Sequence, residues 1–338
     1  MKNKRVLIIY TGGTIGMKKS EKGYAPVAGY IREALATIDD MHREDTPEWE
    51  LVEMSPLLDS SDITVNEWNK IAELIYGSYA DYDGFVVLHG TDTMAYTASA
   101  LSFILDGLDK PVILTGSQIP LSEIRSDGRD NLVTSLIIAA EGVVREVALY
   151  FSGKLLRGNR STKMSADRLV AFDTPNYPYL AEVGISVVYN RAALAPKPKD
   201  ELTLRPFSNV PIGVLKVFPG IQFGLFEAII TDKLSGIVLE TFGAGNIPSS
   251  GGELIPIIKR AFDGGTVVVV CSQCPSGTVS LGAYETSSQL KSAGAVSGLD
   301  MTCEAAVTKL YHLFSLGISK EEIKEKMEKD LCGELTEN

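Results

Sequence analysis

The stretch YTGGTIG, residues 10–16, decides how the rest of the chain is interpreted. It ends an apolar run, VLIIY at 6–10, which predicts a buried strand. Two adjacent glycines permit a sharp turn and a close backbone approach to a ligand, and Thr11 and Thr14 flank them. Such a loop lies at the carboxyl edge of a parallel sheet, where open α/β sheets bind ligands. It predicts either an ordinary turn, a phosphate-binding loop or a site with a catalytic threonine.

A second loop repeats this layout. The apolar run GFVVLH at 84–89 leads into Gly90, Thr91, Asp92 and Thr93. Because parallel strands end at the same edge of a sheet, we expect the two threonine loops to open on the same side. A threonine hydroxyl is a weak nucleophile, so this chemistry also needs a base and donors for an oxyanion.

Strands alternate with helices along the chain, which predicts an α/β fold with a mainly parallel sheet. Residues 194–211 carry four prolines and no periodicity, which is typical of a linker. We therefore predict an N-terminal catalytic α/β domain at 1–192, a linker at 193–211 and a smaller C-terminal α/β domain at 212–338. The predicted strands are 84–89, 111–114, 147–151, 213–218, 236–239 and 266–270, and the predicted helices are 64–76, 94–105, 130–144, 221–230, 253–262, 303–316 and 319–330.

Composition narrows the function class. The chain is 45% hydrophobic and 22% charged, as globular proteins are, and its formal charge of −11 disfavours nucleic acid or an anionic membrane as partner. The apolar run after the basic N-terminus is too short for an export signal, so we expect a cytoplasmic protein. Cys271 and Cys274 form a C-x-x-C without a second pair at zinc spacing, and we interpret them as structural.

The base for a threonine nucleophile is not evident from the two loops. His42, His89 and His312 are the histidines, and each is more simply explained as a structural residue. Lys163, in the run NRSTK at 159–163, is the remaining candidate. A lysine works as a base only where burial or neighbouring cations lower its pKa, and most lysines are solvated.

Carboxylates beside hydroxyls suit a zwitterionic amino acid as ligand. Asp59, Asp62 and Asp92 each lie next to a serine or threonine. A carboxylate would bind the ammonium and hydroxyls the carboxylate of such a ligand, although helix capping also explains each aspartate. The motifs of metalloproteases and phosphate-binding loops are absent, so we expect no metal and no cofactor. The polar segment 17–28, with Tyr24 as its aromatic residue, is long for a connection and is a candidate lid.

Read together, TGGTIG at 11–16 and HGTDTM at 89–94 resemble the two signatures of the bacterial-type L-asparaginases. The resemblance extends over essentially the whole chain and is closest to the cytosolic type I branch. It includes DSSD at 59–62, TGSQ at 115–118, RGNR at 157–160 with Lys163, and GAGN at 243–246.

The resemblance implies hydrolysis of L-asparagine to L-aspartate and ammonia without a cofactor or metal. It implies a doubly wound N-terminal domain, a smaller C-terminal domain, and homo-oligomers, dimers or tetramers, with sites at subunit contacts. It also assigns roles. By the resemblance, Thr14 is the nucleophile and Tyr24 lies on the lid. Lys163 activates a hydroxyl or water at Thr91, and Asp92 binds the substrate ammonium. Ser60 binds the substrate carboxylate beside Asp59 and Ser61, and Asn246 comes from the partner subunit.

Which threonine attacks first stays open: Thr14 is the family expectation, and Thr91 has the nearer base. This chain also departs from its family. Glu240 stands where some cytosolic members carry an arginine in a regulatory asparagine site, and a glutamate would repel the effector carboxylate. We therefore expect weak or absent allosteric activation. Exported members often place glutamine at Ser61 and a glutamate near Tyr284 and Glu285, and we assign no role to Glu285.

Three alternatives remain. The asparaginase-like subunit of a tRNA-dependent amidotransferase shares both signatures but carries a domain before the first strand, which here is expected at about Lys4, and the acidic chain offers tRNA no evident surface. A glutaminase activity is open, because one methylene is worth only about 1–3 kcal/mol of discrimination. A non-catalytic amino-acid sensor would need the aspartate and Ser60, but it would have no use for Lys163.

Overall fold

The computed structural model describes residues 3–21, 23–248, 252–282 and 285–337. The chain divides into two compact units, Met1–Arg205 and Pro206–Asn338. The division falls inside the segment 193–211 expected as a linker. Within that segment, β14 (Thr203–Leu204) pairs with β6 (Leu105–Asp106) of the first unit. The assignment of the whole segment as a linker stays a prediction.

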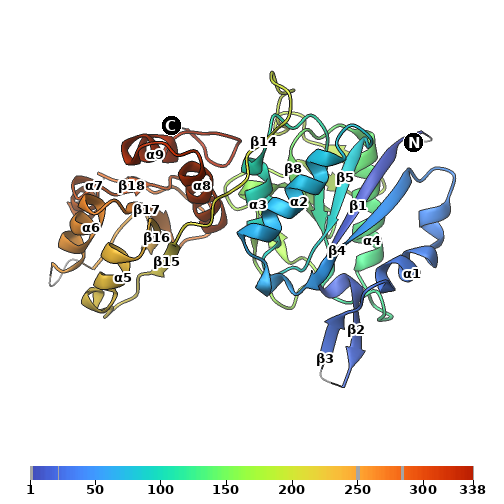
Figure 1. Ribbon diagram of the computed structural model, residues 1–338, viewed down its shortest axis with the longest axis horizontal. Helices are drawn as coiled ribbons and strands as arrows, with labels where there is room; N and C mark the ends of the chain where they lie inside the picture. The colour runs from blue at the N-terminus through green and yellow to red at the C-terminus, as the bar shows by residue number, and fades with distance from the viewer. Residues whose placement is uncertain (1–2, 22, 249–251, 283–284, 338) are drawn as a thin grey trace. The chain divides into compact units, whose positions relative to one another are not determined.

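The first unit is built on an eight-stranded sheet (Figure 1). Its strands are β1 (Arg5–Gly12), β4 (Glu48–Leu58), β5 (Gly84–Leu88), β7 (Val112–Thr115), β8 (Val147–Phe151), β9 (Lys154–Arg157), β12 (Ala181–Val183) and β13 (Val187–Tyr189). Their order across the sheet is β13-β12-β9-β8-β7-β5-β1-β4. From β4 to β8 neighbouring strands run parallel, and the pairings beyond β8 are antiparallel. The expected mainly parallel sheet is confirmed.

Helices cover both faces of this sheet. They are α1 (Tyr30–Ala36), α2 (Val65–Gly77), α3 (Met94–Ile104) and α4 (Gly128–Glu141). Alternate residues of β1, namely Val6, Ile8 and Tyr10, share a core with Leu132 and Leu136 of α4. On the other face α3 contacts β7 and β8 and packs beside α2 (Figure 1). Strands covered on both sides must be apolar throughout, which explains the unbroken apolar runs and confirms the doubly wound expectation.

Two helix starts follow from local chemistry and are confirmed. At α2, the Thr64 hydroxyl accepts a backbone N–H, and the Glu67 carboxylate accepts the Thr64 N–H at 3.1 Å. Ser319 and Glu322 form the same capping box at the start of α9 (Lys320–Met327). Such boxes satisfy backbone donors that a helix leaves open at its first turn.

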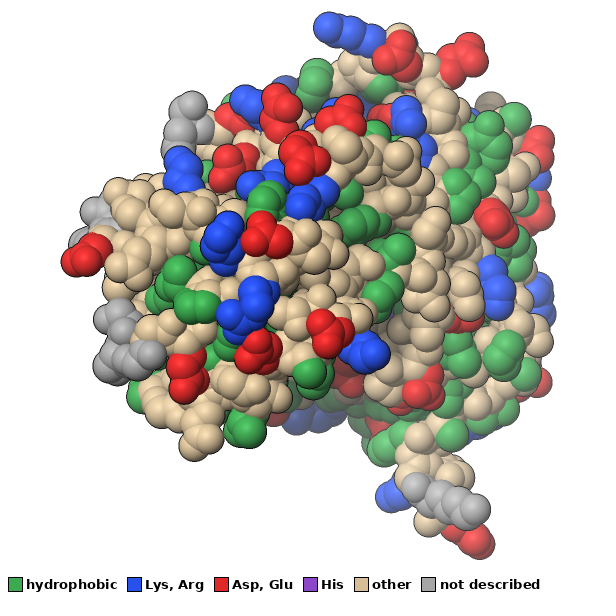
Figure 2. Space-filling view, turned by 60° about the vertical axis from the view of Figure 1, so that its left-hand side comes forward, with side chains coloured by type: hydrophobic (Ala, Val, Ile, Leu, Met, Phe, Trp, Pro, Cys, Tyr) green, Lys and Arg blue, Asp and Glu red, His purple; other side chains and the backbone are tan. Residues whose placement is uncertain are grey.

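The segment 17–28, expected as a long polar connection and a candidate lid, contains two strands. Residues 17–26 form an antiparallel hairpin of β2 (Met17–Ser20) and β3 (Gly23–Pro26), which projects from the first unit (Figures 1 and 2). Lys19 pairs with Tyr24 across the hairpin. The sequence did not predict these strands because both are mostly exposed and carry no apolar alternation.

On the face shown in Figure 2, acidic and basic side chains are interspersed.

Short elements complete the first unit. They are the 3-10 turns η1 (Thr14–Gly16), η2 (Asp39–His42), η3 (Ser60–Asp62) and η4 (Gly158–Arg160), and the paired strands β10 (Thr162–Lys163) and β11 (Phe172–Asp173).

The second unit is a smaller α/β structure. Its parallel sheet has the order β15 (Ile212–Lys216), β16 (Gly236–Thr241), β17 (Val267–Ser272) and β18 (Val296–Ser297). Its helices are α5 (Glu227–Asp232), α6 (Leu254–Asp263), α7 (Glu285–Ser292), α8 (Cys303–Ser315) and α9. The helix expected at 221–230 begins later. Gln222 is extended, and a 3-10 turn, η5 (Phe223–Phe226), precedes α5.

A thiol and an ion pair in the second unit are deeply buried. Burial and the nearby charges of Glu240 and Glu304 raise the pKa of the Cys271 thiol to about 12. Lys309 of α8 pairs with Glu334 at 2.5 Å, and both side chains are 0% exposed. The Glu334 carboxylate also accepts the backbone N–H groups of Leu331 and Cys332. The C-terminal segment is thus fastened to α8 by a desolvated ion pair.

Among the helices that the structure describes, we find none with the length and apolarity required to cross a membrane.

Candidate functional site

Three loops of the first unit meet at the carboxyl edge of its sheet. Gly12 and Gly13, at the end of β1, have φ of 120° and 88°, which side chains rarely adopt. A side chain on Gly13 would overlap the backbone of Gly90, which follows β5. A Cβ on Gly90 would lie 2.5 Å from the Ser60 Oγ and 3.3 Å from the Gly13 Cα. The two threonine loops therefore open at the same edge, as expected, with η3 against them.

Lys163 joins this site from β10. Its Nζ donates to the Thr91 Oγ1 at 2.8 Å and to the Asp92 Oδ1 at 2.7 Å. The lysine side chain is 19% exposed, whereas the Asp92 side chain is 66% exposed. The structure thus brings together three of the predicted residues across 72 positions of sequence. The arrangement can move a proton at Thr91 while Asp92 presents a carboxylate to solvent.

Gln118 is a member of this cluster that sequence reasoning did not assign. The Thr91 hydroxyl donates to the Gln118 Oε1 at 3.1 Å. Backbone N–H groups of Gln118 and Ile119 donate to the Asp127 carboxylate at the start of α4, which anchors the loop. The available signal was its position, three residues past β7, whose end lies at the same edge of the sheet as those of β1 and β5.

His89 supports the Thr91 loop from inside. Its ring is 0% exposed, with Nδ1 2.7 Å from the Gly90 carbonyl and Nε2 2.9 Å from the Thr97 Oγ1. Because the Gly90 carbonyl can only accept, the ring proton lies on Nδ1. The Thr97 Oγ1 accepts the Trp68 indole N–H and donates its own proton to Nε2. Burial lowers the pKa of His89 to about 4. A neutral imidazole engaged on both sides serves to fix the Gly90 peptide, in line with the structural interpretation.

The segment 59–62 is a compact 3-10 turn beside the threonine loops. The Asp59 Oδ1 accepts the backbone N–H and the hydroxyl of Ser61, each at 3.0 Å, so Asp59 caps η3. The Thr93 hydroxyl donates to the Ser60 carbonyl at 2.7 Å and ties the turn to the start of α3. Ser60 is buried against Gly90. Its contact with a ligand stays a prediction.

Thr14 and Tyr24 lie on the loop after β1 and on the hairpin that follows it. Thr14 begins η1 and is half-buried. Tyr24, on β3, is 45% exposed, and its hydroxyl donates to the Glu123 carboxylate at 2.8 Å. That hydrogen bond is the main reason that the pKa of Tyr24 is raised. Sequence reasoning had not singled out Glu123.

Asn246, Glu240 and Glu285 belong to the second unit. The Asn246 side-chain oxygen accepts a hydrogen bond from the Thr286 hydroxyl at 3.1 Å. Glu240 lies on β16, and the Gln273 side chain donates to its backbone carbonyl at 2.7 Å. Glu285 begins α7 and is exposed, while Tyr284 lies outside the described residues.

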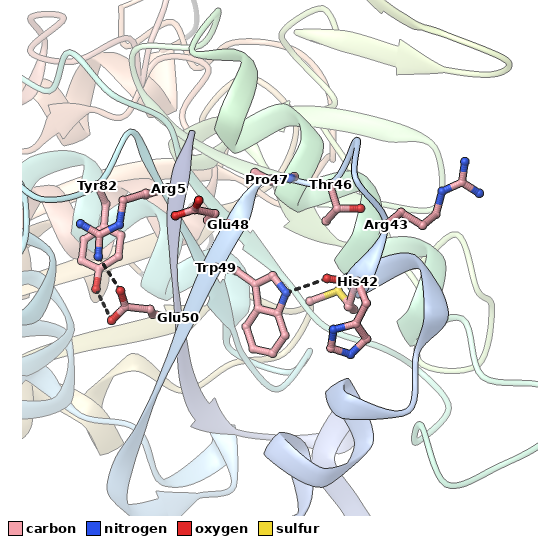
Figure 3. A pocket seen from close by; sticks show the side chains of 10 residues that line it. Arg5, His42, Arg43, Thr46, Pro47, Glu48, Trp49, Glu50 and Tyr82 are labelled. Atoms are coloured by element: carbon pink, nitrogen blue, oxygen red, sulfur yellow. Dashed lines mark hydrogen bonds and ion pairs between the residues drawn. The ribbon is translucent and has the colours of Figure 1, made fainter. Parts of the chain in front are cut away.

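A cavity of about 370 Å³ lies at the opposite, amino edge of the sheet (Figure 3). There the Arg5 guanidinium and the Tyr82 hydroxyl both donate to the Glu50 carboxylate, at 2.5 and 2.8 Å. The Trp49 indole donates to the Met41 carbonyl at 3.0 Å. These groups satisfy one another, and ligands of open α/β sheets bind at the carboxyl edge, so we place the candidate site at the threonine loops.

Comparison with known proteins identifies the family of the chain. The asparaginase N-terminal family model matches residues 5–195, and the glutaminase/asparaginase C-terminal domain model matches residues 211–327. The chain belongs to the asparaginase family. The first match contains Thr14, Thr91, Asp92 and Lys163, and the second contains Asn246.

Individual members of the family are similar over the full length of the chain. L-asparaginase 1 of Escherichia coli is 46% identical over 336 residues, which are 99% of each chain. The crystal structure of L-asparaginase I from Vibrio cholerae is 46% identical, with a TM-score of 0.91 over 98% of this chain and 99% of that one. The thermostable L-asparaginase from Thermococcus kodakarensis is 34% identical, with a TM-score of 0.90 over 99% and 100%.

Proposed function

We propose that this chain hydrolyses L-asparagine to L-aspartate and ammonia, with Thr14 as nucleophile and an aspartyl ester as intermediate. The observation that carries the proposal is the contact of Lys163 with both Thr91 and Asp92, beside a second threonine loop packed on Gly90. Full-length similarity to L-asparaginase 1 of Escherichia coli supports the choice of substrate.

The site offers groups for each end of an amino acid. The exposed Asp92 carboxylate binds the substrate ammonium alongside Lys163, because two cations can share one carboxylate. The Ser60 hydroxyl binds the substrate carboxylate, with Asp59 and Ser61 holding the turn that presents it. These contacts would leave the side-chain carboxamide facing the threonines.

The reaction then has two steps. The Thr14 Oγ attacks the carboxamide carbon and forms a C–O bond; the C–N bond breaks, and nitrogen leaves as ammonia with the proton that the hydroxyl lost. Water adds to the ester carbon, the bond to Thr14 breaks, and aspartate leaves as the hydroxyl is restored. Lys163 donates to Thr91 as it stands, so it must lose a proton before it can act as a base at the Thr91 hydroxyl or at a water held there.

Thr91 is the second candidate for the attacking group because its hydroxyl has the nearer base, at 2.8 Å. Tyr24 would act from the β2–β3 hairpin as a lid residue near Thr14. Asn246 would reach the site from a partner subunit in a homodimer or homotetramer, and we place the protein in the cytoplasm. Light scattering with size-exclusion chromatography tests the oligomer.

Regulation by asparagine at a second site should be weak or absent, because Glu240 carries a negative charge where an arginine would bind an effector carboxylate. We expect the rate to rise hyperbolically with asparagine concentration. A sigmoidal curve from the pure protein would contradict this.

The deciding assay is ammonia release from asparagine by the purified protein, run in parallel with glutamine. Thr14→Ala should lower the rate by at least about 10³-fold because it removes the nucleophile. Thr14→Ser keeps a hydroxyl and is the matched control. In Thr91→Ala, intact-protein and peptide mass spectrometry should find the aspartyl ester on Thr14; an ester on Thr91 in Thr14→Ala would reverse the assignment.

The same assay separates the alternatives. A non-catalytic sensor would bind asparagine, which calorimetry detects, without releasing ammonia. Faster release from glutamine than from asparagine would make the chain a glutaminase first.

A further inference from the structure

The hydrogen-bond chain that begins at Lys163 ends at a residue without an assigned role. The lysine donates to the Thr91 oxygen, and the Thr91 hydroxyl donates to Gln118. We propose that Gln118 is a positioning residue that holds the Thr91 proton and thereby favours the ammonium form of Lys163. The inference rests on the proposed function in taking Lys163 as the base of the reaction.

The orientation of the Gln118 carboxamide is fixed by its surroundings. Its Nε2 donates to the backbone carbonyls of Ala166 and Arg168, at 3.3 and 3.1 Å. A rotated amide would place its oxygen against these two acceptors and replace two hydrogen bonds with repulsive contacts between oxygens. The Oε1 therefore faces Thr91 as an acceptor, and its loop is anchored through the Asp127 carboxylate.

Two protonation states compete for the Thr91 proton. While Lys163 is an ammonium, it donates to Thr91, and the hydroxyl proton satisfies Gln118. A neutral Lys163 keeps two N–H donors and gains a lone pair, so the Thr91 hydroxyl can then donate either to Gln118 or to the lysine. Without the Gln118 oxygen, the hydroxyl has an acceptor among these groups only when Lys163 is neutral, so Gln118 favours the ammonium state. Removing the acceptor should let the base form at lower pH.

Other charged groups near Lys163 also influence its proton. Asp92 contacts the ammonium directly at 2.7 Å. Asp167 and Arg168 lie in the segment after β10, and Asp173 lies on the paired strand β11, where it accepts the Tyr179 hydroxyl. A substitution at Gln118 also removes its hydrogen bonds to the Ala166 and Arg168 carbonyls, so the test compares two variants that both lose them and of which only one keeps an acceptor toward Thr91.

The test is the pH profile of kcat/KM for asparagine in Gln118→Met, which keeps the length of the side chain without its polar ends. The acidic limb should move to lower pH by about 0.5–1 unit, the worth of one ordinary hydrogen bond. Gln118→Glu keeps an acceptor toward Thr91 and adds a negative charge, so its acidic limb should move to higher pH. Gln289→Met, on the exposed surface of α7, is the matched control and should follow the wild type.

A second readout needs no catalysis. Acetic anhydride acetylates a lysine only in its neutral form, and the extent at Lys163 can be followed against pH by mass spectrometry without substrate. The labelling curve of Gln118→Met should move in the same direction as its activity profile. Profiles that superimpose on the wild type in both measurements would overturn the inference. If the wild type releases no ammonia, the proposed function fails, while the labelling curves still decide the role of Gln118.

Discussion

The two threonine loops leave neighbouring parallel strands and touch each other, yet they are held very differently. The Thr91 hydroxyl is bonded on both sides, to Lys163 and to Gln118, and buried His89 fixes the preceding peptide. The Thr14 loop continues into an exposed hairpin that is attached to the segment 121–123 at its surface. Under the proposed function, the firmly held side transfers the proton, and the other presents its hydroxyl from a turn beside an accessible hairpin.

Among the substitutions on the Thr91 side, replacement of Lys163 should cause the largest loss of activity. Lys163→Met should lower kcat/KM for asparagine by about 10²–10⁴-fold, the usual contribution of a general base. The measurement is steady-state ammonia release at the optimum of the wild type. Lys199→Met, at an exposed position, is the matched control. A variant within tenfold of the wild type would remove Lys163 from the mechanism.

The burial of His89 beneath the Thr91 loop can be tested by measuring the stability of the protein at low pH. His89 titrates at about 4 in the fold against 6.5 outside it, so the unfolded chain binds the extra proton as the pH falls from 6.5 to 4. Over that window the folded state should lose about 3 kcal/mol relative to a variant without this imidazole.

Thermal unfolding of the wild type and His89→Gln at several pH values measures this difference. The wild type should lose Tm more steeply below pH 6.5. His42→Gln, at an exposed site, controls for the loss of a histidine and should keep the steeper slope. Parallel curves for the wild type and His89→Gln would show that burial of His89 carries no acid penalty.

The contact between the two loops can be broken with one methyl group. A Cβ in Gly90→Ala would lie 2.5 Å from the Ser60 Oγ and 3.3 Å from the Gly13 Cα. We expect about 1–3 kcal/mol of destabilisation and about a 10²-fold loss of activity, because the reacting groups are displaced. Gly184→Ala meets nothing within 4 Å and should change neither quantity. Full activity in Gly90→Ala would mean that the loops tolerate separation.

The smallest effect is expected on the Thr14 side. Tyr24→Phe removes the hydroxyl that contacts Glu123 and should lower kcat/KM by about tenfold if the lid completes the site, the worth of one hydrogen bond. Glu123→Gln keeps an acceptor and should change the rate less than about threefold. Wild-type kinetics in Tyr24→Phe would remove this residue from the predicted catalytic set.

Much of this architecture follows from local sequence. The runs at 6–10 and 84–88 are unbroken because both faces of their strands are buried, so their short length and the glycines that follow them identify them as strands. Thr64 with Glu67, and Ser319 with Glu322, are complete capping signals within four residues. The glycines after β1 and β5 mark the turns, and the threonines mark the site.

The features that could not be predicted from the sequence depend on tertiary structure. The β2–β3 hairpin pairs exposed residues, so burial left no pattern in its sequence. The role suggested for Gln118 arises where a loop after β7 meets the carbonyls of Ala166 and Arg168, some 50 residues away. A backbone carbonyl has no identity in sequence, and thus no motif could have revealed its partner.

Because of the buried pair between Lys309 and Glu334, the stability of the second unit depends on the C-terminal segment. A polypeptide shortened before Glu334, whether by early termination or by an exopeptidase, would leave a lysine ammonium in an apolar interior without its counterion. Losing one partner of such a pair costs about 3–5 kcal/mol, a large part of the stability of a domain. Incomplete copies would therefore be more exposed to cellular proteolysis than chains that extend through Glu334.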